Sequence, residues 1–140
     1  MQRGRCWLVV LALLVVSAWM NERVGAENQK VPSIKAIMKK ANDGDESLFG
    51  QVGKQLLSDE PNWTDIRTKT KELIVLADSL GKNTPPKGAR ESWENLTKAY
   101  VANLKVLDDA AQKKNKDMLD AAHQKLITSC SGCHKLHKGK

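Results

Sequence analysis

The sequence predicts an all-α protein, an antiparallel four-helix bundle whose C-terminal helix carries a pair of cysteines. Apolar residues recur every three or four positions from Pro32 onward, which is the period of an amphipathic helix. No segment shows the strict alternation of apolar and polar residues that is typical of a half-buried strand. Three long helices and a divided first one, joined by short loops, therefore favour an antiparallel bundle.

The first 26 residues are predicted to be a secretion signal that does not belong to the fold. Arg3 and Arg5 form its positive start, residues 7–20 its apolar core, and residues 24–26 a small-residue cleavage site. An uncleaved membrane anchor is the alternative, although the apolar core is shorter than the roughly 20 residues of a membrane span. We expect cleavage after Ala26, leaving residues 27–140 as a single domain in a periplasmic protein.

The first bundle helix is predicted in two pieces. Pro32, a residue suited to the first turn of a helix, precedes the first piece. The apolar face of that piece is formed by Ile34, Ile37, Met38 and Ala41. The polar residues 42–46 then interrupt the pattern. The second piece carries the apolar residues Leu48, Phe49, Val52, Leu56 and Leu57.

The three long helices follow one another with clear breaks between them. Residues 58–61 form a capping-type start for the first, and Gly81 supplies its stop. Residues 83–88, with two prolines and a glycine, cannot continue a helix, and the polar residues 112–116 mark the next break. The helices are predicted over residues 63–80, 93–111 and from 117 onward. The last helix is expected to direct five side chains toward the interior of the bundle: Leu119, Ala122, Leu126, Cys130 and Cys133.

Residues 130–134 read Cys-Ser-Gly-Cys-His, the pattern by which a polypeptide carries a covalently attached c-type haem. On a helix, Cys130, Cys133 and His134 share one face, because they lie three and four residues apart. Two sulfurs on neighbouring turns can hold one porphyrin edge while the imidazole beside them binds the iron. The thiols must be reduced when they add to the two vinyl groups, and attachment after export agrees with the secretion signal.

The other side of the iron is expected to face the first helix. Met38 is the one methionine in the segment 34–41, which is the antiparallel neighbour able to reach that side. Its thioether would complete a His/Met ligand pair, which raises the reduction potential and suits electron transfer. The alternative is that Met38 fills the core. His137 is interpreted as an exposed polar residue or a partner for a haem propionate, and His123 as a helix-surface histidine without a role.

Two other site types use the same cysteines. A thioredoxin-type dithiol would require a preceding strand and a βαβ setting, and the pattern predicts neither. A structural zinc could combine Cys130 and Cys133 with His123 and His137, since two thiolates and two imidazoles suit tetrahedral zinc. However, His123 precedes His134 by ~16 Å along a continuous helix, so the helix would have to break.

The position of the motif at the end of an exported helical chain resembles the class II cytochromes c, the cytochrome c′ family and its low-spin relatives. The similarity covers most of residues 32–140 and includes the Ile-Lys-Ala-Ile-Met run at 34–38. It implies a four-helix bundle, one haem c attached through Cys130 and Cys133, and His134 as the proximal ligand.

The same resemblance places Met38 where low-spin members have a methionine ligand and high-spin members an occluding apolar side chain. Two positions depart from cytochrome c′ itself. Ile34 stands where an arginine is often found, and His137 replaces an aromatic residue often seen after the motif. Both departures weigh against a five-coordinate gas-binding site and leave haem attachment unaffected.

These observations predict an exported monohaem cytochrome that carries single electrons between redox proteins and is not an enzyme, because no acid–base residue is evident near the distal face. The alternative is a five-coordinate, cytochrome c′-like protein that binds NO or CO. The net charge is +7, and removal of the signal reduces it to +5. Nucleic acid is not expected as a partner of an exported protein. The positive surface would steer docking on acidic redox proteins or a membrane surface, or is simply solvated, and a homodimer is compatible with the small bundle.

Overall fold

The computed structural model describes residues 30–139, and all regular structure in this range is helical. The all-α prediction is therefore confirmed, whereas the predicted secretion signal lies outside the described residues. No helix between residues 30 and 139 combines the length and the apolar character needed to cross a membrane. The five helices are α1 (Ile34–Asn42), α2 (Leu48–Leu56), α3 (Trp63–Gly81), α4 (Arg90–Gln112) and α5 (Lys116–His137).

Four of these helices begin at a side chain that accepts a hydrogen bond from a free N–H group of the first turn. These capping residues are Ser33, Ser47, Asn62 and Asn115. The fourth helix has no such cap and follows Ala89 directly. The sequence predicted its start at Trp93, three residues too late, because Ala89 does not carry the side-chain signal that marks the other starts.

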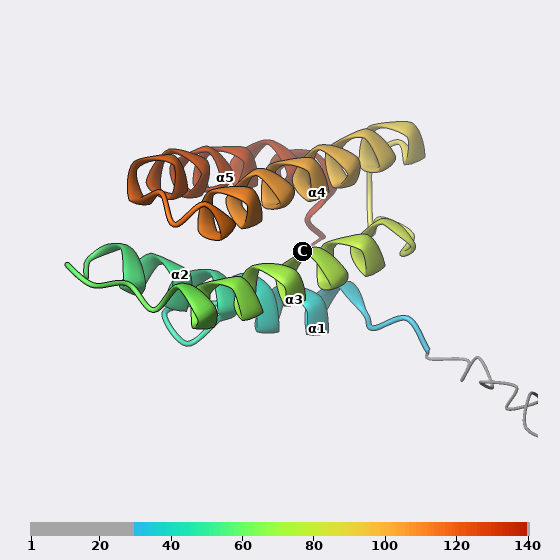
Figure 1. The fold of residues 1–140 in the computed structure, drawn as a ribbon. Helices are drawn as coiled ribbons and strands as arrows, with labels where there is room; N and C mark the ends of the chain where they lie inside the picture. Colours follow the sequence, from blue (N-terminus) through green and yellow to red (C-terminus); the bar gives the residue numbers. More distant parts are fainter. Residues whose placement is uncertain (1–29, 140) are drawn as a thin grey trace, which may run out of the picture.

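The long helices α3, α4 and α5 run antiparallel in succession, with α4 packed between α3 and α5 (Figure 1). Both α1 and α2 pack on α3, but of these two only α2 also reaches α5. The Cα atoms of α1 nowhere come within 8 Å of those of α4 or α5. The helices are therefore in close contact at the end where α2 meets α5, which we call the closed end. They are separated at the end where α1 faces α4 and α5, which we call the open end.

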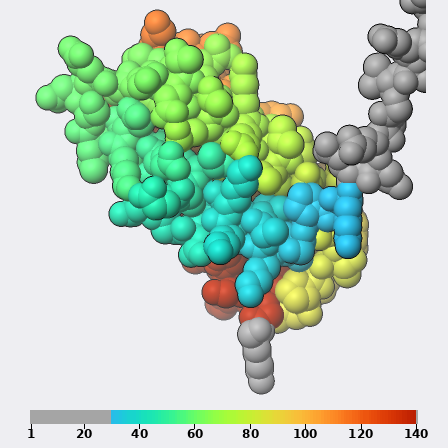
Figure 2. Space-filling view, turned by 90° about the horizontal axis from the view of Figure 1, so that it is seen from below, coloured from blue at the N-terminus to red at the C-terminus, as the bar shows by residue number. Residues whose placement is uncertain are grey.

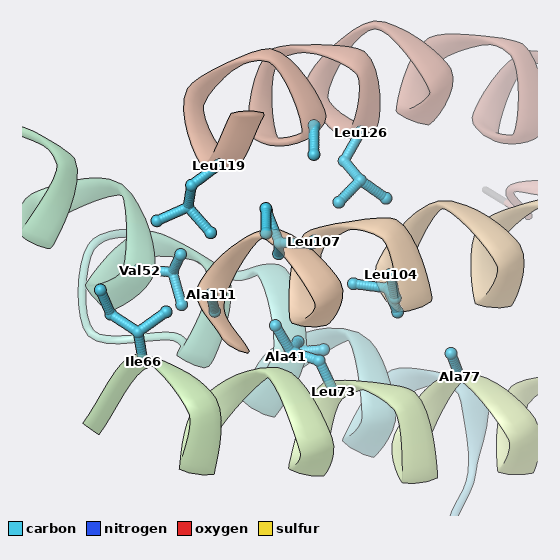
Figure 3. Close-up of a cluster of buried hydrophobic side chains, with 12 residues drawn as sticks. Ala41, Val52, Ile66, Leu73, Ala77, Leu104, Leu107, Ala111, Leu119 and Leu126 are labelled. Atoms are coloured by element: carbon cyan, nitrogen blue, oxygen red, sulfur yellow. The ribbon is translucent and has the colours of Figure 1, made fainter. Parts of the chain in front are cut away.

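The main core lies at the closed end and draws buried side chains from all five helices (Figure 3). It contains Ala41, Val52, Ile66, Leu73, Ala77, Leu104, Leu107, Ala110, Ala111, Leu119, Ala122 and Leu126. A smaller cluster of Ile37, Leu80 and Trp93 lies at the open end, with Met38, Tyr100 and Cys133 half-buried against it. Most of the apolar stabilisation thus comes from the closed end.

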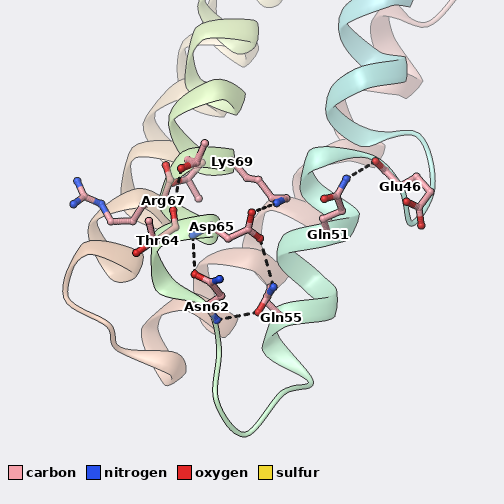
Figure 4. A network of polar contacts seen from close by, with 10 residues as sticks. Glu46, Gln51, Gln55, Asn62, Thr64, Asp65, Arg67 and Lys69 are labelled. Atoms are coloured by element: carbon pink, nitrogen blue, oxygen red, sulfur yellow. Dashed lines mark hydrogen bonds and ion pairs between the residues drawn. The ribbon is translucent and has the colours of Figure 1, made fainter.

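A polar network holds the turn between α2 and α3 (Figure 4). The backbone N–H of Asn62 donates to Gln55 Oε1 at 3.0 Å, and Gln55 Nε2 donates to Asp65 Oδ2 at 3.5 Å. Asp65 also forms an ion pair with Lys69 one turn later on α3. The short helix α2 is therefore tied to the first turns of α3, which helps to keep it against α5.

His123 belongs to this closed end and not to the helix surface, so the surface interpretation was wrong. Its side chain is 7% exposed, and its ring stacks on Phe49 with centroids 4.0 Å apart. The Nε2 atom lies 3.3 Å from the Phe49 carbonyl oxygen, while Nδ1 is buried without a partner. Burial lowers the pKa of His123, and the Phe49 carbonyl and Asp120 offset part of this effect.

We expect the free energy of unfolding to decrease as the pH falls below the ordinary histidine pKa of 6.5. The unfolded chain then binds a proton at His123 before the folded chain does, which favours unfolding until the lowered folded pKa is reached. Urea unfolding at pH 7.5 and pH 5 measures this decrease. It should be smaller in His123→Gln, and an identical decrease in both proteins would contradict the prediction.

Candidate functional site

A cavity of about 950 Å³ lies at the open end, between α1, α4 and the last turns of α5. It exists because α1 stays apart from α4 and α5, and its volume is within the roughly 300–1,000 Å³ of small-molecule sites. Figure 2 shows α1 (blue), the start of α4 with the segment before it (yellow) and the end of α5 (red) meeting at this end. Its lining includes Ile34, Met38, Asn42, Trp93, Tyr100, Cys130, Cys133 and His134.

The helix α5 continues through the Cys-Ser-Gly-Cys-His motif to His137, so the motif residues occupy adjacent turns of one helix. Cys130 and Cys133 are half-buried free thiols that line the cavity. Burial raises the pKa of both thiols, which are therefore protonated at neutral pH. His134 lines the same cavity and is otherwise exposed. The structure thus brings these three residues to one wall of the cavity.

The surroundings of the two cysteines differ from those expected for a thioredoxin-type dithiol or a structural zinc site. Reactive dithiols carry a cysteine of lowered pKa, whereas burial raises the pKa here. The histidines that zinc would require lie apart, because His123 packs on Phe49 at the closed end. Within residues 30–139, no three His, Cys, Asp or Glu side chains are grouped so that they could hold a metal ion.

Met38 lies on α1, on the cavity wall opposite the motif. Its side chain is half-buried against the small cluster of Ile37, Leu80 and Trp93. Asn42, four residues later on the same face of α1, places its Nδ2 atom 3.6 Å from Met38 Sδ. The thioether is therefore part of the cavity wall and is also in contact with a polar group.

Asn42 and Tyr100 are site residues that the sequence reasoning missed. Asn42 lies in the polar interruption at residues 42–46, and Tyr100 lies within the helix predicted over residues 93–111. In the structure, Asn42 Nδ2 lies 3.1 Å and Oδ1 3.2 Å from the Tyr100 hydroxyl oxygen. Burial raises the pKa of Tyr100 to about 12, so the phenol keeps its proton at neutral pH. The one sequence signal for this contact was the spacing of four residues between Met38 and Asn42, which places both on the same face of a helix.

His137 is 2% exposed, so its interpretation as an exposed residue was wrong. Its Nδ1 atom lies 2.9 Å from the Lys87 carbonyl oxygen, which can only accept, so Nδ1 carries the hydrogen. Its Nε2 atom then accepts from the Ser92 hydroxyl at 3.0 Å. Neither ring nitrogen is left for a propionate, and the pair of bonds anchors the last turn of α5 to the start of α4.

Gly88 makes this anchor possible, and replacing it with alanine should destabilise the protein by about 1–3 kcal/mol. Its φ is +82°, and an added Cβ would lie 2.7 Å from His137 Nδ1 and 2.8 Å from the Leu136 carbonyl oxygen. Gly132→Ala is the matched control, because a Cβ there meets nothing within 4 Å. On the helix α5 it should stabilise by about 0.5–1 kcal/mol. Urea unfolding compares the two, and equal changes would contradict the prediction.

Comparisons of the chain with protein-family models, with curated proteins and with solved structures return no match. Two free thiols on adjacent turns, an imidazole beside them and a thioether across a cavity fit the donor set of a covalently held haem. The predominantly apolar wall of the cavity suits a flat porphyrin.

Proposed function

We propose that this protein is an exported monohaem c-type cytochrome that carries single electrons between redox proteins. The observation that carries the proposal is the cavity, which has Cys130, Cys133 and His134 on one wall and Met38 on the other. The proposal includes an antiparallel four-helix bundle in which α1 and α2 together take the place of one helix.

In this proposal Cys130 and Cys133 hold one haem c through two thioethers. Each vinyl group of the haem would take up the sulfur of one thiol on one carbon and its hydrogen on the other, so attachment needs reduced cysteines and no oxidant. Both cysteines are free, which meets that requirement. In this proposal His134, which lies next to Cys133 on α5, would bind the iron. His134 lines the cavity and is exposed, so its ring is accessible to a group bound there.

The residues around the cavity are suited to electron transfer. When bound, the haem supplies one-electron chemistry between ferric and ferrous iron. Met38 would complete the ligand set from α1, and a His/Met pair raises the reduction potential. Lys35, Lys39 and Lys138 line the cavity and are exposed, so they can orient an acidic redox partner.

The proposal is tested by producing the full chain in a bacterial host that matures c-type cytochromes in its periplasm. The intact mass should equal the polypeptide from Glu27 onward plus one haem, and a reduced-minus-oxidised spectrum should show c-type bands. The same chain without residues 1–26 should stay haem-free in the cytoplasm. A colourless periplasmic product at the mass of the bare polypeptide would overturn the proposal.

Carbon monoxide distinguishes electron transfer from gas binding. A reduced protein whose iron is held by His134 and Met38 should resist CO, whereas Met38→Ala should bind it rapidly. Rapid stoichiometric binding of CO or NO by the unmodified protein would instead support the five-coordinate, cytochrome c′-like alternative.

A further inference from the structure

The helices α1 and α4 face each other across the cavity and, besides the apolar contacts of the small cluster, are joined by one side-chain hydrogen-bond contact. Their Cα atoms stay more than 8 Å apart, since no pair lies within that distance. Asn42 at the end of α1 meets Tyr100 in the middle of α4, with polar atoms 3.1 and 3.2 Å apart. Among residues 30–139, this is the one side-chain hydrogen-bond contact between these two helices. Together with the packing of Ala41 in the main core, this contact holds the end of α1 near α4.

The same amide also contacts the sulfur of Met38. Asn42 Nδ2 lies 3.6 Å from Met38 Sδ, within the range of a hydrogen bond to sulfur. An amide nitrogen has two hydrogens, so Asn42 can donate to Met38 and still pair with Tyr100. The Tyr100 hydroxyl can donate to Asn42 Oδ1 because burial keeps it protonated. The side chains of Tyr100, Asn42 and Met38 thus form a continuous series of polar contacts from α4 to the thioether.

We propose that Asn42 and Tyr100 are positioning residues that orient the Met38 thioether toward the cavity and so close the distal side of the iron. This inference rests on the proposed function. A methionine side chain has three rotatable bonds and adopts many orientations when nothing holds it. A donor on one lone pair of sulfur restricts these orientations and leaves the other lone pair for the metal.

Two effects of this arrangement act in the same direction on the reduction potential. Holding Met38 on the iron favours the high potential of a His/Met pair. The hydrogen bond to sulfur also withdraws electron density from the ligand, which favours the reduced iron. Loss of the Asn42 amide should therefore lower the potential and open the distal side to CO.

The test uses the haem-loaded full chain with Asn42→Ala, Tyr100→Phe and the control Asn103→Ala. Asn103 also lines the cavity, from α4, and like Asn42 it is half-buried. In Asn42→Ala, CO should bind the reduced protein about tenfold faster, the ratio expected for one hydrogen bond. Tyr100→Phe should show a smaller increase and Asn103→Ala less than about a twofold change. Equal rates in Asn42→Ala and Asn103→Ala would overturn the inference.

The variant Asn42→Asp distinguishes two roles of Asn42: donating a hydrogen bond to the Met38 sulfur, and linking α1 to Tyr100 on α4. This variant keeps the shape and an acceptor for the Tyr100 hydroxyl but has no N–H to offer Met38. We expect it to bind CO as fast as Asn42→Ala does. CO binding at the unmodified rate would overturn the role of the amide donor.

Repeating the Asn42→Ala substitution in a protein that already lacks Met38 tests whether Asn42 acts through the Met38 thioether. In Met38→Leu, adding Asn42→Ala should leave the CO rate unchanged, because there is no thioether to orient. The same tenfold increase in that background would overturn the inference, since Asn42 would then only restrict access. A haem-free product would overturn the proposed function instead. A haem-loaded unmodified protein that binds CO at once would overturn this inference and leave haem attachment intact.

Discussion

Replacing both Cys130 and Cys133 with alanine should abolish covalent haem attachment completely. These thiols line the cavity on adjacent turns of α5 and are free, and the described chain offers no other cysteine for a thioether. His134 alone could hold the group only reversibly, through a single metal bond. The purified variant should therefore lose all pigment in acid and show the mass of the bare polypeptide.

The matched control for this variant is Ser129→Ala with Ser131→Ala. These serines flank Cys130 on α5 and bond only to carbonyl oxygens of their own helix. The control should keep one haem after denaturation, because both thiols and the helix are retained. A double-cysteine variant that still carries the mass of one haem in acid would refute covalent attachment at the motif.

Leu107→Ala should lower the free energy of unfolding by about 2–5 kcal/mol, the range for deleting a buried leucine side chain. Leu107 is 0% exposed and lies in the main core, where it points from α4 toward Leu119 and Leu126 of α5 (Figure 3). Truncation removes apolar contacts and leaves a cavity that the surrounding helices cannot fully close. Urea unfolding followed by circular dichroism measures the loss.

The neighbouring residue Val106 provides the control, since its side chain is 50% exposed. Val106→Ala should change the free energy of unfolding by no more than about 0.5 kcal/mol. Leu107 belongs to the closed end and does not line the cavity, so Leu107→Ala should still acquire haem at the motif. Similar losses in the two variants would show that the core is not centred where the structure places it.

The helices were largely predictable because their signals are local. A repeat of three or four residues and a capping side chain report on the chain over one or two turns. Ser33, Asn62 and Asn115 cap helices close to where the periodicity predicted them. The start of α4 was misplaced because Ala89 has no capping side chain, so no local signal marked it.

The two histidine errors show what local patterns do not report. His123 is buried because Phe49 of α2 stacks on it, and His137 because Ser92 and the Lys87 carbonyl meet its ring. In each case the partners lie at least 45 residues away in the sequence. Periodicity shows which face of a helix a residue occupies, but not what covers that face.

By itself, the sequence determined the all-α class and the shared helix face of Cys130, Cys133 and His134, because both depend on residue type and spacing along one helix. Only the tertiary structure decided that α1 stands away from α4 and α5, and that the resulting cavity has Met38 on the wall opposite the motif. The same is true of the Asn42–Tyr100 contact, whose members are 58 residues apart. The physical reason is that distances between helices follow from the packing of side chains from several helices at once, which no local pattern contains.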